Sequence, residues 1–269
     1  MNKGYVIYAQ NTHSTNYIDC ATTLANSLKS CMPNCNVSLI TSENVNNTIF
    51  DQVIPLPYGD LDPFSDWKLM NDWQVYEASP YEYTIKLEAD LYIPSSIDYW
   101  WDTLMKRDLV VCTNIRNFKQ SISDIKSYRK FIYDNNLPDT YNAITYFKKS
   151  ALAEKFYSLV RDIFENWEDI KIILKCNNKE PASTDWVYAI ASRLVGEENC
   201  TLPQFNSFSM IHMKKFINDM FTEDWTNNFV YEILPNTFRI NTFPQLYPLH
   251  YIKKDFCLTI DKELECRKN

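Results

Sequence analysis

The chain has 269 residues and a net charge of −7, and 45% of its residues are hydrophobic, with aromatic residues alone at 15%. The length is enough for one large α/β domain or two small ones, and the composition supports a sizeable core. Composition and charge exclude a disordered chain and an overall basic field for nucleic acid. Only Gly4, Gly59 and Gly196 are glycines, so the clustered glycines of a G-x-G-x-x-G fingerprint and of a P-loop are both excluded.

Eight cysteines are scattered along the chain without a Cys-x-x-Cys pair. This pattern argues against a thiolate zinc site and fits free thiols in a reducing compartment. No apolar run approaches membrane-spanning length, and residues 1–8 lead into a strand-like segment without a signal-peptide pattern. We therefore expect a cytoplasmic protein.

The first part of the chain predicts alternating strands and a helix. Residues 5–10 form an apolar strand, and the helix that follows begins at Asn16, which can cap it with Asp19 in the first turn. Residues 37–41 and 52–56 predict two more strands. This β-α-β-β order favours a sheet with parallel pairing and covering helices.

The alternation continues through the rest of the first 200 residues. Thr184 is expected to cap the last helix, with Asp185 in its first turn, and Gly196 suits its end. Residues 201–269 hold short apolar stretches, so we expect one domain, 1–269, with a core over 1–200 and a C-terminal extension over 201–269. The other expected elements are strands over 83–94, 109–112 and 141–147, and helices over 67–78, from Ser96 and over 150–174.

Two carboxylates mark the strand predicted over residues 83–94. The segment is rich in β-branched and aromatic residues, and Pro94 stops it. Residues i and i+2 of a strand point to the same side, so Glu88 and Asp90 should project together. Hard cations such as Mg²⁺ and Mn²⁺ take one or two carboxylates plus substrate phosphates as ligands. The alternative is two solvated acids at a strand edge.

Two lysines and two aromatic residues are further candidates for nucleotide binding. Lys68 and Lys86 could neutralise a diphosphate, although surface lysines usually have no such role. Tyr8 or Trp67 could stack on a base, although core packing is the more common use of aromatic side chains.

The three histidines, His13, His212 and His250, are candidate metal ligands, because neutral imidazole binds metals. A lone histidine is more often structural, and His13 reads as a solvated loop residue. A basic run between residues 116 and 130 reads as a solvated helix face or as a local patch for nucleic acid. Its members are Arg116, Lys119, Lys126, Arg129 and Lys130.

Four segments resemble parts of the GT-A class of nucleotide-sugar glycosyltransferases, in the branch that includes glycogenin-like family 8 enzymes. The resemblance covers most of residues 4–215 and implies a Rossmann-like mixed sheet flanked by helices, with a C-terminal extension that completes the site. The matching segments are Val6–Asn11, Phe50–Ile54 ahead of Trp67-Lys68, Leu87–Pro94, and Tyr141–Phe147 followed by Thr184–Trp186.

The resemblance implies a glycosyltransferase that uses a nucleoside-diphosphate sugar, with a UDP-sugar as the first candidate, and Mn²⁺ or Mg²⁺. It also implies retention of anomeric configuration. It assigns the metal to Glu88, Asp90 and His212, with His250 as the rival histidine, and acceptor positioning or catalysis to Asn142 and Asp185. The residues that it implies for the nucleotide sugar are Ala9, Gln10, Asn11, Thr41, Trp67, Lys68 and Glu88.

Two positions depart from the family pattern: Glu88 stands where the first aspartate is usual, and Ile144 replaces a glycine. The chain also resembles glycosyltransferase-like proteins of large tailed phages, which implies work in the host cytoplasm and a modified base, or a sugar on it, in phage DNA as acceptor. A glycan or protein acceptor, a nucleotidyltransferase and a non-catalytic nucleotide-binding protein remain alternatives.

Overall fold

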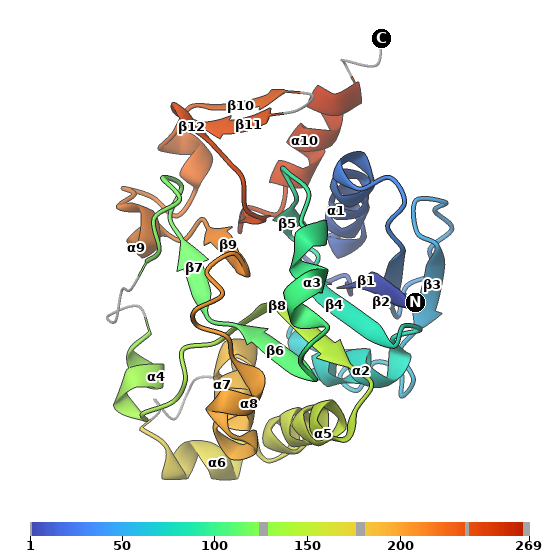
Figure 1. Cartoon of the computed structure of the whole chain (residues 1–269), viewed down its shortest axis with the longest axis vertical. Helices are drawn as coiled ribbons and strands as arrows, with labels where there is room; N and C mark the ends of the chain where they lie inside the picture. Colours follow the sequence, from blue (N-terminus) through green and yellow to red (C-terminus); the bar gives the residue numbers. More distant parts are fainter. Residues whose placement is uncertain (1, 124–128, 176–180, 235–236, 266–269) are drawn as a thin grey trace.

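The computed structural model describes residues 2–123, 129–175, 181–234 and 237–265, and within them it contains three β-sheets (Figure 1). The strands of the largest sheet are Lys3–Tyr8 (β1), Val37–Thr41 (β2), Gln52–Pro55 (β3), Tyr83–Glu88 (β4), Leu109–Cys112 (β6) and Tyr141–Lys148 (β8). Their order is β3-β2-β1-β4-β8-β6. The first four run parallel, and β8 is antiparallel to both of its neighbours. The predicted mixed sheet is confirmed.

Helices cover both faces of this sheet. The main ones are Tyr17–Cys31 (α1), Trp101–Leu104 (α3), Ala151–Glu165 (α5) and Thr184–Val195 (α7). Side chains of β1 alternate between the faces: Tyr5 and Ile7 pack with α1 and α3, while Val6 and Tyr8 pack with α5 and α7. The side chains on each face of the sheet form a separate core, and the carboxyl ends of the central strands lie between the two cores.

The helix ends follow local capping chemistry. The Asn16 side chain accepts hydrogen bonds from the backbone N–H groups of the first turn of α1, as predicted. The N-cap of α7 is Ser183 and not Thr184, and Gly196 ends that helix with a φ of 93°, which favours glycine. The helix expected over 150–174 is interrupted at Asn166, whose side chain bonds back to the Asp162 carbonyl.

A second sheet brings C-terminal segments to the end of β4. Its strands are Leu91–Tyr92 (β5), Asn114–Arg116 (β7), Ser209–His212 (β9) and Leu249–His250 (β13). Their order is β5-β13-β9-β7, with β13 antiparallel to β5 and parallel to β9. The prediction of one strand over 83–94 was therefore wrong, because the chain turns at Ala89-Asp90 and leaves the first sheet for the second.

The C-terminal segment also forms a small antiparallel sheet and a helix. These elements are Tyr231–Leu234 (β10), Thr237–Ile240 (β11), Phe243–Pro244 (β12) and Phe256–Glu265 (α10). In Figure 1, α10 lies beside α1 at the top of the molecule. The Sγ atoms of Cys20 and Cys257 lie 3.7 Å apart between these two helices, so the C-terminal segment packs directly against α1, which covers one face of the six-stranded sheet.

The helix predicted over 67–78 differs from the observed structure. Residues Lys68–Gln74 form a 3-10 helix (η1), and only Val75–Ala78 (α2) are α-helical. The reason is local: the buried Asn71 and Gln74 side chains accept hydrogen bonds from the backbone N–H groups of the preceding loop, at Leu61 and Tyr58. This ties the segment to that loop.

The remaining short helices are Asp98–Trp100 (η2), Lys130–Asp134 (α4), Trp167–Ile173 (α6), Glu197–Cys200 (α8), Lys215–Asn218 (α9) and Trp225–Asn227 (η3). Among the described residues, no helix combines the length and the apolar character that crossing a membrane requires.

Candidate functional site

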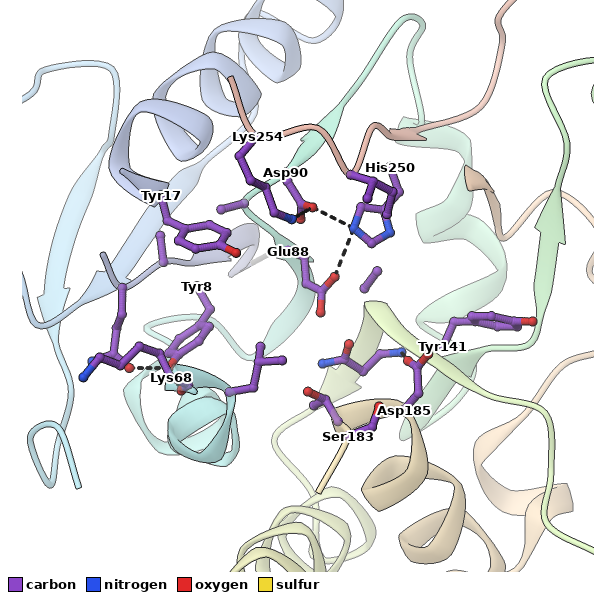
Figure 2. Close-up of a pocket in the computed structure, with 18 of the residues that line it drawn as sticks. Tyr8, Tyr17, Lys68, Glu88, Asp90, Tyr141, Ser183, Asp185, His250 and Lys254 are labelled. Atoms are coloured by element: carbon purple, nitrogen blue, oxygen red, sulfur yellow. Dashed lines mark hydrogen bonds and ion pairs between the residues drawn. The ribbon is translucent and has the colours of Figure 1, made fainter. Parts of the chain in front are cut away.

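A cavity of about 460 Å³ lies at one edge of the six-stranded sheet (Figure 2). Residues that follow β1, the last residue of β4 and the first residues of β8 all line it. The parallel strands end at this edge and the antiparallel β8 begins there, as expected for ligand sites at the carboxyl ends of parallel strands. The start of α7 and the strands β9 and β13 close the other side.

Two carboxylates and a histidine meet on one wall of the cavity. The Nε2 atom of His250 lies 2.8 Å from Asp90 Oδ2 and 3.6 Å from Glu88 Oε2. One ligand atom from each of the three residues lies within 4.8 Å of the other two. Two carboxylate oxygens and one imidazole nitrogen form a donor set that fits Mn²⁺ well and Mg²⁺ acceptably.

The alternation of side chains along one strand does not by itself bring Glu88, Asp90 and His250 together. Glu88 is the last residue of β4, Asp90 lies in the turn after it, and His250 stands opposite Leu91 where β13 pairs with β5. The backbone N–H of Tyr251 donates to the Asp90 carbonyl at 3.2 Å. The two acids are side by side as predicted, but a turn and a second sheet bring them together with the histidine.

Lys254 is a fourth member of this cluster that the sequence reasoning missed. Its ammonium forms an ion pair with the same Asp90 oxygen that His250 contacts. Burial raises the pKa of Asp90, but the neighbouring His250 and Lys254 side chains outweigh this effect and hold the pKa well below its usual range. For Glu88, burial dominates and raises the pKa. The position of Lys254, four residues after His250, was the only signal in the sequence.

The structure gives His250, and not His212, a place in the acidic cluster. His212 stands beside His250 because the two residues are paired in register between β9 and β13. Their ring centroids are 4.8 Å apart, and His212 also lines the cavity. Burial, followed by the nearby His250, lowers the pKa of His212 well below its usual value, so its imidazole is neutral.

The opposite wall contains both residues that were expected on the acceptor side. Asp185 Oδ1 accepts the Asn142 backbone N–H at 2.9 Å, and Asp185 Oδ2 pairs with Arg129 Nη1 at 2.6 Å. Arg129 is buried, also pairs with Asp139 at 2.7 Å, and lies 4.1 Å over the Tyr141 ring. Both Asp185 oxygens are therefore engaged, which suits a residue that positions the start of β8.

Two buried polar groups on this wall have no hydrogen-bond partner within the described part of the chain. They are Asn142 Nδ2 and Thr184 Oγ1, on residues that are 2% and 3% exposed and that both line the cavity. Buried polar atoms are nearly always satisfied, and unpaired ones call for a ligand or water. This wall therefore offers an uncharged donor and a hydroxyl to a bound molecule.

The wall nearer β1 and η1 carries part of the expected nucleotide site. Ala9, Gln10, Trp67 and Lys68 line the cavity. Gln10 is fixed by hydrogen bonds to Ser42 and Asn71, and the Trp67 indole donates to the Ala182 carbonyl at 2.8 Å. The Lys68 ammonium pairs with Asp60 at 2.7 Å.

Two of the residues expected at the nucleotide do not line this cavity. The Asn11 side chain accepts the Ile18 N–H at the start of α1, and the Thr41 hydroxyl accepts the Glu43 N–H in the turn after β2. Tyr17, Asp66 and Ser183 line the cavity instead and were not predicted.

Lys86 is not available to neutralise a diphosphate, so this candidate role is excluded, and it is not a surface lysine either. Its side chain is fully buried and pairs with Asp72 at 2.5 Å. The Tyr188 hydroxyl donates to the same aspartate. Lys86 shares a face of β4 with Glu88, but it lies two residues further back along the strand, and its ammonium is buried between the sheet and α7, 5.5 Å from the centre of the Tyr188 ring.

The basic run between residues 116 and 130 is not a single solvated face. Arg116 is buried, donates to the Gln120 and Asn206 carbonyls at 2.6 and 2.8 Å, and lies over the Tyr247 ring. Arg129 pairs with Asp139 and Asp185, and Lys130 pairs with Asp134 within α4. Lys126 lies outside the described residues.

Comparison with known proteins gives matches among solved structures alone. No protein-family model and no curated protein matches the chain. The galactosyltransferase LgtC, in complex with donor and acceptor sugar analogues, is 12% identical with a TM-score of 0.55, covering 97% of this chain and 94% of that one. An active-site mutant of LgtC is also 12% identical, with a TM-score of 0.54 and coverage of 96% and 95%.

The bifunctional glycosyltransferase WbbM is 12% identical with a TM-score of 0.47; the match covers 79% of this chain and 40% of WbbM. The chain thus spans less than half of that protein. The likeness to LgtC over nearly the whole of both chains establishes that this protein has the mixed α/β fold of GT-A glycosyltransferases, as the sequence predicted.

Proposed function

We propose that the protein is a metal-dependent glycosyltransferase that moves a sugar from a nucleoside-diphosphate sugar, with UDP-sugars first, to an acceptor hydroxyl. The observation that carries this proposal is the cluster of Glu88, Asp90 and His250 at the sheet edge, on the wall of a cavity in a GT-A fold. A divalent cation held by such a cluster suits a sugar nucleotide, because the departing diphosphate is negatively charged.

Mn²⁺ or Mg²⁺ held by Glu88, Asp90 and His250 would act as a Lewis acid that stabilises the negative charge of the departing diphosphate. Lys254 and Lys68 also line the cavity and would supply further positive charge. Preorganised charges of this kind contribute most in a site that excludes water. Trp67, Ala9 and Gln10 form the wall that would take the nucleoside.

The acceptor would bind against Asn142 and Thr184. Their unpaired amide and hydroxyl groups can bond a neutral hydroxyl compound, and Asp185 holds the Asn142 backbone in place. Retention of configuration follows from the family 8 likeness. A glycan is favoured over a base in DNA, because Arg116 and Arg129 are buried and already bonded, so neither is free to contact phosphates.

Release of UDP from a panel of UDP-sugars tests the proposal, with purified protein, Mn²⁺ or Mg²⁺, and excess EDTA as the control. We expect metal-dependent release with at least one sugar, and a GDP-sugar or ADP-sugar arm checks the base. The competing function is a non-catalytic nucleotide-binding protein of the same fold. Binding of UDP without release from any donor would support that alternative.

A further inference from the structure

One carboxylate oxygen of the candidate metal site is already paired with a positively charged side chain of the protein. The Lys254 ammonium and His250 Nε2 both contact Asp90 Oδ2. The Asp90 side chain is 4% exposed, so few water molecules can compete for this oxygen. In the described structure, one of the three candidate metal ligands is thus already paired with a lysine (Figure 2).

The placement of Lys254 is fixed by the fold. The lysine stands between β13 and α10, and its backbone carbonyl lies 3.6 Å from Cys20 Sγ on α1. Its ammonium lies 5.3 Å from the centre of the Tyr17 ring. The neighbouring Lys253 points elsewhere and pairs with Asp224 at 2.6 Å. Only one of the two adjacent lysines reaches the acidic cluster.

We propose that Lys254 is a tethered cation that holds Asp90 when no metal is bound, so that a divalent metal must displace the Lys254 ammonium from Asp90 in order to bind. This inference rests on the proposed use of Glu88, Asp90 and His250 as metal ligands. A metal that coordinates Asp90 Oδ2 would lie directly against the Lys254 ammonium, and the repulsion between the two cations is large inside a poorly solvated site.

The displacement has a measurable cost for metal affinity. A ligand that binds only the fraction of molecules in a competent state shows an apparent Kd raised by the inverse of that fraction. If the lysine leaves Asp90 in about one molecule in ten, the apparent Kd for Mn²⁺ is about tenfold weaker than that of the bare site. Once displaced, the ammonium remains next to the cavity and faces it.

Mn²⁺ binding to the nucleotide-free protein tests this inference, with free Mn²⁺ measured by electron paramagnetic resonance. We expect Lys254→Met to bind Mn²⁺ about tenfold more tightly than the unaltered protein. Lys254→Arg, which keeps the charge, should stay close to the unaltered protein. Lys253→Met removes the same charge one residue away and should change the Kd by less than about twofold, because its partner Asp224 lies outside the cluster.

Equal or weaker Mn²⁺ affinity in Lys254→Met overturns the inference, and Lys254→Gln repeats the test should the methionine variant unfold. If the unaltered protein binds no Mn²⁺ and Lys254→Met does, the competition is confirmed; if neither binds, the inference fails. The outcome is independent of transfer activity. A protein that shows the expected Mn²⁺ affinities but releases no UDP from any sugar nucleotide would refute the proposed function alone.

Discussion

Asp90 and His250 are 160 positions apart in the chain, and a 2.8 Å hydrogen bond joins their side chains. The bond links the turn after β4 to β13, so the C-terminal segment completes the acidic cluster that the core begins. A site built in this way depends on the packing of α10 and β13 as much as on the central strand.

We expect Asp90→Asn to lower metal-supported UDP release by about 100-fold or more while the protein still folds, because the change removes a charged ligand from the site. UDP release at saturating Mn²⁺ and thermal unfolding measure the two effects. Asp98→Asn is the matched control, since Asp98 is exposed and its contact with Lys3 is 3.7 Å. Full activity of Asp90→Asn would contradict metal use at this cluster.

His250→Ala should weaken Mn²⁺ binding more than His212→Ala does. The reason is position: His250 Nε2 lies within reach of both carboxylates, while His212 stacks behind it with a ring separation of 4.8 Å. Mn²⁺ affinity, measured by titration for each variant, tests this order. A larger loss in His212→Ala would restore the ligand that the sequence resemblance implied.

The contrast between these histidines shows what the sequence could and could not predict. Strand period and composition predicted a strand over residues 83–94, and β4 occupies Tyr83–Glu88 of it, because strand propensity is a local property of the chain. The choice of His250 depends on the pairing of β13 with β5, two short strands whose partners lie far away in the sequence. No local sequence pattern predicts such a pairing.

Partners that lie far away in the sequence also explain why the roles of two lysines were not predicted. Lys86 was weighed as a surface lysine, but its fully buried partner, Asp72, comes from the 3-10 segment that was expected to be a helix. Lys254 follows a two-residue strand and has no pattern of its own. By contrast, the Asn16 cap was predictable because the cap and its partners are within three residues of each other.

Lys86→Met should lower the free energy of unfolding by about 3–5 kcal/mol, since it leaves a buried Asp72 carboxylate without its counter-charge. Equilibrium unfolding in urea measures this change. Lys155→Met, at an exposed position of α5, should change it by less than about 0.5 kcal/mol. Adding Asp72→Asn to Lys86→Met should recover much of the loss; no recovery would show that packing, and not the unpaired charge, is the cause.

We expect that the protein does not bind DNA through contacts with its phosphates. Arg116 and Arg129 are buried and bonded within the protein, so few contacts with phosphates remain in the basic run. We expect no binding to plain or hydroxymethylcytosine-containing duplexes at low salt, measured by fluorescence anisotropy across a salt series. Tight binding that weakens steeply with salt would instead support a nucleic-acid acceptor.

Thr184→Val should weaken acceptor use and leave the fold intact or slightly more stable. The Thr184 hydroxyl is buried without a hydrogen-bond partner in the described residues, so its removal relieves a desolvation cost of about 1 kcal/mol in the free protein. The same change removes a group that can bond an acceptor hydroxyl. We expect a higher KM for the acceptor, unchanged UDP release to water, and a Tm equal to or above that of the unaltered protein.

Thr145→Val, at a buried strand position whose hydroxyl already bonds the Asn142 carbonyl at 3.3 Å, is the control and should lower the Tm. A lower Tm with an unchanged acceptor KM in Thr184→Val would mean that this hydroxyl serves the fold and not the ligand.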